Sequence, residues 1–189
     1  MVYKQILGAL AVFLALVSYF PYVRDIMKGE TKPHAFSWLI WLILTAVGFF
    51  IQMENGAGPG AWFNGFMIFV CAFIMIAGIA KGRSEIIFVD WICLALASIA
   101  TYFWLVAKDP YISITLVIAA DALGTIPTIR KSYIHPHTET IETYAINAFR
   151  IFLAIFALEK ISFVTASYHV YMILANALLV SVLLVRRKK

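Results

Sequence analysis

Charged residues are scarce in this sequence. They make up 13% of its 189 residues, whereas apolar residues make up 63% and give a mean hydropathy of +0.90. A soluble domain contains roughly 25% charged and roughly 45–50% apolar residues. The composition therefore excludes a soluble globular protein and predicts a chain that lies mostly in a lipid bilayer.

Motifs that carry chemistry are also missing. The two cysteines, Cys71 and Cys93, lie inside apolar runs without metal-ligand or redox spacing, so we interpret them as packing residues. The sequence has no glycine-rich phosphate loop, no zinc-binding His/Glu motif and no Ser, His and Asp at hydrolase spacing. We therefore expect no enzymatic activity, no bound metal and no cofactor.

Long apolar runs are what the sequence does contain. Each is too long for a strand and lacks alternation of period two, which predicts helices. A helix needs about 20 apolar residues to cross a bilayer, and seven such spans would use nearly the whole chain. The first run is preceded by one basic residue and has no cleavage site, so we interpret it as a span and not as a signal peptide. The seven runs are roughly 4–22, 35–53, 60–80, 86–106, 110–129, 140–158 and 162–185.

The basic residues alternate between the connections. If the N-terminus lies outside, the inner segments hold eleven Lys and Arg residues and the outer segments hold only Lys4, Lys108 and Lys160. This asymmetry is typical of a plasma (inner) membrane protein with its C-terminus in the cytoplasm. Basic inner loops favour anionic membrane lipid, and no extramembrane surface remains for nucleic acid. The inner residues are Arg24, Lys28, Lys32, Lys81, Arg83, Arg130, Lys131, Arg186, Arg187, Lys188 and Lys189.

The sequence contains a weak internal repeat. The segments Phe20–Arg24 and Ile126–Arg130 both read apolar-Pro-x-x-Arg, 106 residues apart, and two Pro-His pairs recur 103 residues apart. We predict two parallel triple-helix repeats, residues 1–83 and 109–189, joined by a linker helix within residues 84–108. Such repeats are a transporter architecture in which the site lies between the copies. The alternative is that Pro, His and basic residues gather at membrane ends without any duplication.

With this 3+1+3 pattern the chain resembles the SWEET, SemiSWEET and PQ-loop superfamily over its whole length. The resemblance rests on Pro21, Pro127 and the loop Lys28–Lys32, although Tyr22 and Thr128 stand where the family has glutamine. It implies alternating access by rocking of two triple-helix bundles, with Pro21 and Pro127 as hinges. It also implies a small solute, such as a sugar or an amino acid, as the partner.

Three polar residues fall near the middle of their spans. At ~1.5 Å per residue, Asp121, Arg150 and Asn176 each lie roughly 15–18 Å from a membrane face. Polar groups at this depth are costly and usually functional. Asp121 and Arg150 could neutralise each other as an interhelical ion pair. Alternatively, Arg150 could hold a substrate carboxylate by a bidentate contact, and Asp121 could carry a coupling proton.

Further candidates surround these residues. Tyr144, Asn147 and Arg150 share one helix face because they recur every three residues. The resemblance implies that Trp41 and Asn64 line the site in the first repeat, with Tyr144 and Asn176 in the second. The first repeat has no charged counterparts, because Ala15 and Val47 stand at the equivalent positions. We expect one central cavity, lined by Trp41, Asn64, Asp121, Tyr144, Asn147, Arg150 and Asn176.

The sequence thus favours a secondary transporter or facilitator of a small polar solute, with proton coupling as an open alternative. A non-transporting receptor on the same scaffold, a KDEL-receptor-like role, remains the main rival. A subunit, a scaffold or an unrecognised membrane enzyme is a third class. Among transporters, a PnuC-like vitamin carrier competes with a sugar or amino-acid carrier, because Trp38 and Trp41 could stack on a ring. Both repeats in one chain would allow a functional monomer, and a homo-oligomer is left open.

Overall fold

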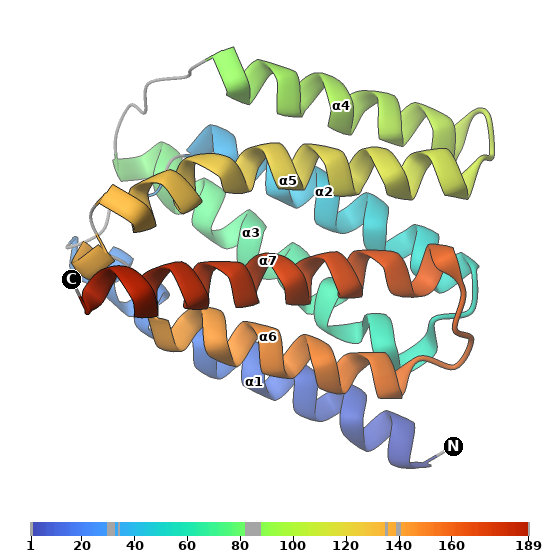
Figure 1. Cartoon of the computed structure of the whole chain (residues 1–189). Coiled ribbons are helices and arrows are strands. Elements are labelled where there is room, and N and C mark those ends of the chain that lie inside the picture. Colours follow the sequence, from blue (N-terminus) through green and yellow to red (C-terminus); the bar gives the residue numbers. More distant parts are fainter. Residues whose placement is uncertain are drawn as a thin grey trace.

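The structure, a computed structural model, describes residues 2–29, 33, 35–81, 88–134, 136–138 and 141–188. All regular elements of these segments are helices, as predicted (Figure 1). Part of the predicted repeat and its boundary lies outside the described residues, namely residues 30–32, His34 and residues 82–87. The elements are α1 (Val2–Lys28), α2 (Ala35–Glu54), η1 (Gly58–Ala61), α3 (Trp62–Lys81), α4 (Phe88–Leu105), α5 (Pro110–Ile134), η2 (Pro136–Thr138), α6 (Ile141–Ala157) and α7 (Phe163–Arg187).

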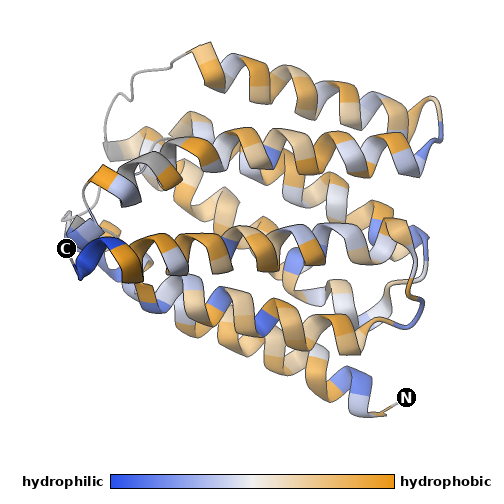
Figure 2. Ribbon diagram, viewed as in Figure 1, coloured by the Kyte–Doolittle hydropathy of each residue, from blue (hydrophilic) through white to orange (hydrophobic). Residues whose placement is uncertain are grey.

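The helices are those of a membrane-embedded protein. Within the described segments, α1, α2, the stretch Gly58–Ala80 and α7 are each long and apolar enough to cross a bilayer, and α4 and α5 hold shorter apolar stretches. Large apolar side chains such as Phe69 and Phe88 are 74% and 78% exposed on the helix surfaces. Figure 2 shows hydrophobic residues along the outward faces of the helices. Soluble monomers rarely expose continuous apolar surface of this kind.

Among the described residues, three α-helices precede α4 in the chain and three follow it. The helix α3 packs against both α1 and α2, and α7 packs against both α5 and α6. We call α1, α2, η1 and α3 the first half, and α5, η2, α6 and α7 the second half. The halves meet along two seams, where α1 packs on α6 and α2 packs on α5.

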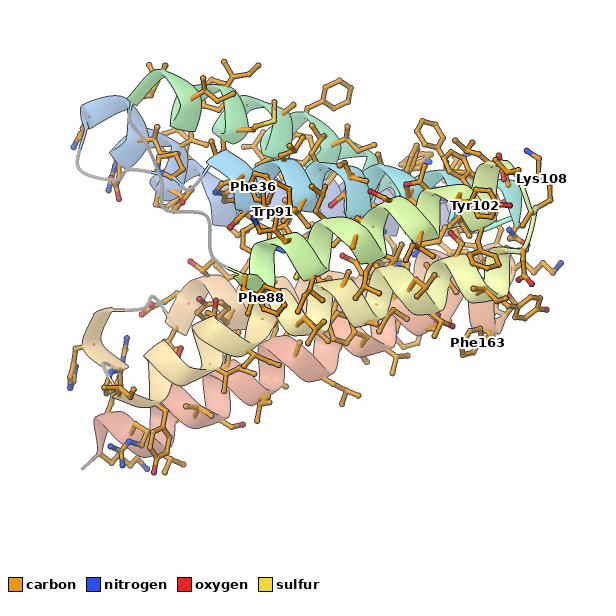
Figure 3. All side chains as sticks on the ribbon, turned by 90° about the horizontal axis from the view of Figure 1, so that it is seen from above. Phe36, Phe88, Trp91, Tyr102, Lys108 and Phe163 are labelled. Atoms are coloured by element: carbon orange, nitrogen blue, oxygen red, sulfur yellow. The ribbon has the colours of Figure 1, made fainter. Side chains whose placement is uncertain are left out.

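The helix α4 covers the seam between α2 and α5 (Figure 3). Near one end of α4, the rings of Trp91 and Phe36 lie 5.4 Å apart. Near the other end, Trp104 stacks on Phe50 at 5.6 Å and its indole Nε1 donates a hydrogen bond to Glu54 Oε2 at 2.8 Å. Aromatic contacts at both ends therefore hold α4 against α2.

The chain termini lie at opposite ends of the bundle (Figure 1). The helices α1, α3, α5 and α7 finish at one end, which we call the C-terminal end; the other is the N-terminal end. At the C-terminal end, Arg186 Nε donates to the Tyr133 carbonyl at 2.9 Å and Arg187 Nε donates to the Pro136 carbonyl at 3.0 Å. These bonds tie the last turn of α7 to the connection between α5 and α6.

The predicted hinge prolines do not terminate their helices. Pro21 lies inside α1, which continues to Lys28, and position 127 lies inside α5, which continues to Ile134. Both helices are thus several residues longer than the predicted spans, which ended at residues 22 and 129. A hinge role for Pro21 and Pro127 remains a prediction.

The two halves are joined tightly at the N-terminal end. The loop before α7 donates two backbone hydrogen bonds to the loop before α3. The amides of Glu159 and Lys160 donate to the carbonyls of Ala57 and Gly56, each at 3.0 Å. The ring of His169, which is fully buried on α7, bonds the Gly60 carbonyl through Nε2 at 2.9 Å. We call this contact the N-terminal closure.

Two glycines allow the backbones to approach this closely. A Cβ on Gly8 of α1 would lie 2.6 Å from the Pro59 carbonyl oxygen, and a Cβ on Gly60 would lie 2.8 Å from the backbone nitrogen of Leu158. Both clashes are with backbone atoms, which cannot rotate away as a flexible side chain can. The packing of α1 and α6 on η1 therefore requires glycine at these two positions.

The first prediction concerns this packing. Gly8→Ala should lower the free energy of unfolding of the purified protein by about 1–3 kcal/mol, the usual cost of overpacking. Gly48→Ala is the matched control, because it also replaces a glycine within a helix but its Cβ would meet Val117 only at 3.8 Å. Thermal unfolding in detergent should therefore separate the two variants. Equal stability would contradict the close approach of α1 and Pro59.

Candidate functional site

Polar side chains gather in the middle of the bundle, between the two halves. Tyr19 on α1 and Tyr168 on α7 each have both Arg150 and Asp121 as electrostatic neighbours, and both also lie near Cys71. These groups come from five helices that surround one region. We call this set the central polar cluster: Ser18, Tyr19, Thr45, Cys71, Asp121, Asn147, Arg150, Tyr168 and Tyr171.

Arg150 is the most enclosed cation that the structure describes. Its side chain is 1% exposed, and its Nε donates to Asn147 Oδ1 at 2.8 Å. The same oxygen accepts a hydrogen bond from Ser18 Oγ of α1 at 3.1 Å, which links the two halves. The guanidinium carbon lies 5.0 Å from the centre of the Phe63 ring on α3. Asn147 reaches Arg150 because residues three apart share one helix face.

One nitrogen of this guanidinium has no hydrogen-bond partner. Arg150 Nη1 is buried and unbonded within the described structure. A buried donor without an acceptor costs about 1–3 kcal/mol, and more when the group is charged. The residues around Arg150 therefore supply one carboxamide acceptor and an aromatic face, and leave further donor capacity unused.

Asp121 has a separate environment. It is 8% exposed, and its Oδ2 accepts a hydrogen bond from the Tyr171 hydroxyl of α7 at 2.7 Å. The Tyr171 oxygen also lies 3.3 Å from Thr125 Oγ1, one helical turn after Asp121 on α5. Asp121 and Arg150 are both described, and no ion pair joins them. The helix α7, which packs on both α5 and α6, supplies Tyr171 as the partner of the carboxylate instead.

The other predicted residues lie in several places. Asn64 Nδ2 donates to Gln52 Oε1 at 3.1 Å, which places it at the end of α2 and the start of α3. Asn176 Nδ2 donates to the Met172 carbonyl of its own helix at 2.8 Å. Tyr144 is half-buried on α6. The structure thus brings Asn147 and Arg150 into direct contact, whereas Asn64 lies near the N-terminal end with Gln52 as its partner.

Trp41 lies where α2 faces α5. Its ring makes an edge contact with Trp38, with centroids 5.1 Å apart, and Trp38 lies 5.7 Å from Tyr22. A Cβ on Gly124 of α5 would lie 3.7 Å from Trp41 Nε1. The seam between α2 and α5 is therefore lined by an aromatic group, whereas the seam between α1 and α6 carries the polar contact between Ser18 and Asn147.

No family model, curated protein or solved structure matches this chain. Within the described residues, no group of three or more His, Cys, Asp or Glu side chains is placed to hold a metal ion. The functional argument therefore rests on the central polar cluster itself.

Several members of this cluster were not selected from the sequence. Ser18 is a single small polar residue in an apolar run, a pattern that gives no signal by itself. Tyr168 and Tyr171 are three residues apart, the same spacing that drew attention to Tyr144 and Asn147, so this signal was available. Tyr19 could not be found in this way, because its importance comes only from the helices that α1 meets.

The second prediction tests the role of Asn147 as a shared acceptor. Asn147→Ala removes the bonds from Arg150 Nε and Ser18 Oγ together, and should destabilise the protein by about 1.5–3 kcal/mol because a charged donor loses its partner. Ser18→Ala removes only one neutral donor and should cost about 0.5–1.5 kcal/mol. Thermal unfolding of the two variants in detergent measures the difference. A larger loss for Ser18→Ala would contradict this arrangement.

Proposed function

We propose that this chain is a secondary transporter or facilitator of a small polar solute, with seven spans in a 3+1+3 arrangement. The observation that carries the proposal is the central polar cluster, a set of buried and half-buried polar groups between two helical halves at mid-length of an apolar bundle. Polar groups at such a depth typically mark a solute or ion pathway. In this proposal the first half, the linker α4 and the second half correspond to the predicted segments 1–83, 84–108 and 109–189.

The helix bounds support a duplicated architecture. The ends of α1 and α5, at Lys28 and Ile134, are 106 residues apart, and so are the starts of α2 and α6, at Ala35 and Ile141. The ends of α3 and α7, at Lys81 and Arg187, have the same separation. The other bound of each pair gives a different separation: 108 residues for the starts of α1 and α5, 103 for the ends of α2 and α6, and 101 for the starts of α3 and α7. At an offset of 106 the counterpart of Arg150 is Leu44, and at the offset of 103 it is Val47.

The contacts between the halves support the same relation. The offset of 106 places Ser18 opposite Gly124 and Trp41 opposite Asn147. Ser18 bonds Asn147 across one seam, and Gly124 faces Trp41 across the other. An approximate twofold axis along the bundle would exchange these two contacts. Repeats of this kind place the solute site at their interface.

A rocking mechanism fits the distribution of contacts. The N-terminal closure joins the halves at one end through backbone hydrogen bonds, and the central polar cluster lies deeper in the bundle. In the proposed topology the N-terminus lies outside, so this conformation is closed on the outer side. Opening would separate the loop Gly56–Gly60 from Leu158–Lys160, and the solute would then reach the cluster from outside.

A chain of contacts links the cluster to this closure. The Arg150 guanidinium lies on Phe63, the Phe63 ring contacts His169 edge-on at 5.3 Å, and His169 bonds Gly60. A solute that moves Arg150 would therefore disturb a residue that packs directly against the closure. This route offers a physical means of coupling solute binding to opening.

Uptake into liposomes tests the proposal most directly. The panel should contain sugars, amino acids, small carboxylates and ring-containing vitamins, because Trp38 and Trp41 also suit a PnuC-like role. Each solute should be measured with and without a pH gradient. Uptake of at least one solute supports the transporter, whereas binding without uptake of any solute would favour the receptor alternative.

The third prediction locks the closure. A Cβ on Gly56 would lie 3.5 Å from Lys160 Cβ, which suits a disulfide. In the double variant Gly56→Cys, Lys160→Cys, oxidation should reduce uptake of the identified solute to background, and dithiothreitol should restore it. The native Cys71 and Cys93 are buried, at 2% and 3% exposure, and should not interfere.

The single variants are the matched controls for this experiment. Gly56→Cys carries the same backbone strain at a φ of +83°, and Lys160→Cys carries the same loss of charge, but neither can form the bridge. Their uptake should not respond to oxidant. If the oxidised double variant transports as fast as the reduced one, opening at the N-terminal end is not part of the mechanism.

The fourth prediction concerns Asp121 as a proton carrier. Asp121→Asn preserves the shape of the side chain and can still accept a hydrogen bond from Tyr171, but it cannot take up and release a proton. If the carrier is proton-coupled through Asp121, the variant should keep solute exchange and lose accumulation driven by a pH gradient. Exchange and driven uptake in the same liposomes measure this. Unchanged accumulation would remove Asp121 from the coupling mechanism.

A further inference from the structure

We infer that the solute is a small organic anion whose carboxylate binds Arg150. The inference rests on the proposed function, because Arg150 is 1% exposed and an anion reaches it only when the halves separate. It goes further by naming the charge and the chemical group that the central polar cluster selects.

The guanidinium has unused donors at a fixed position. Of its five N–H groups, the one on Nε is used by Asn147, and both on Nη1 are without an acceptor. Phe63 supports one face of the planar group, and Asn147, on the same helix, holds Nε. In the planar group one N–H of Nη1 is parallel to one N–H of Nη2, so these two nitrogens together match the two oxygens of a carboxylate.

The charge of Arg150 has no counter-ion from the described residues. The one ion pair recorded for them joins Arg24 and Asp25 near the end of α1. Asp121 has Tyr171 as its partner on another helix. Removing one partner from a buried ion pair is strongly destabilising because it leaves an uncompensated charge, and Arg150 is already in that condition. A negative charge on the solute supplies the missing partner.

In the proposed repeat, apolar side chains fill the positions of the first half that correspond to Asp121 and Arg150. Leu44, which the offset of 106 makes the counterpart of Arg150, is 1% exposed, and Ala15, the counterpart of Asp121, is fully buried. The first half thus fills the equivalent positions with apolar side chains. The guanidinium is therefore specific to the second half, and we assign its unused donors to the solute.

Binding of carboxylates by the purified full chain tests the inference. Thermal unfolding in detergent should be followed with sodium acetate, benzoate and succinate, and with acetamide, benzamide and succinamide at the same concentrations. At least one carboxylate should raise the unfolding temperature in a concentration-dependent manner, because a ligand that binds the folded state stabilises it. The amides and sodium chloride of equal ionic strength should not.

Variants assign the effect to the guanidinium. Arg150→Gln should abolish the response, and Arg150→Lys, which keeps the charge but loses the fork, should weaken the apparent affinity roughly tenfold. Arg24→Gln is the control, since Arg24 is exposed at the end of α1 and should respond like the parent protein. If Arg150→Gln does not fold, the response of Arg150→Lys decides the question.

The outcomes separate this inference from the proposed function. A carboxylate response that depends on Arg150, with no uptake into liposomes, supports the anion site and contradicts the transporter. Uptake of a neutral solute that is unchanged in Arg150→Lys supports the transporter and overturns the anion site. Equal stabilisation by chloride, by the amides or in both Arg150 variants would also overturn it, as would no response to any of the three carboxylates.

Discussion

A guanidinium enclosed in an apolar bundle without a carboxylate partner is the constraint around which the centre of this protein is organised. The charged guanidinium of Arg150 donates a hydrogen bond to Asn147. The same Asn147 oxygen accepts a hydrogen bond from Ser18 on the other half. Phe63 adds the favourable interaction of a cation with an aromatic face. Arg150 and Asn147 of α6 therefore link this helix to α3 and α1, respectively.

The two seams between the halves solve the same packing problem in different ways. At the seam between α1 and α6, small residues such as Gly8 and Ser18 let the helices and η1 approach closely. At the seam between α2 and α5, Trp41 faces Gly124, and α4 covers the outside. The proposed rocking would change both seams together, because it moves the two halves relative to each other.

The proposed duplication explains why the two halves resemble each other in helix bounds and differ in chemistry. The paired helices are separated by 101 to 108 residues in their bounds, yet Asp121 has Ala15 and Arg150 has Leu44 or Val47 as its counterpart. A charged residue in a span is costly unless it has partners. In the second half Tyr171 and Asn147 provide those partners, and the first half avoids the cost with apolar residues.

The sequence alone determined that the chain is helical and suited to a membrane, because length and polarity of a helix are properties of consecutive residues. In the part of the chain that the structure describes, seven α-helices overlap the seven predicted runs, and the shared face of Asn147 and Arg150 follows from helix periodicity. Only the tertiary structure decided which helices are neighbours, and therefore that Asp121 bonds Tyr171 and not Arg150, and that Asn64 bonds Gln52. Depth along a helix can be counted from the sequence, whereas the partner of a side chain depends on the lateral order and rotation of helices, which packing between distant segments fixes.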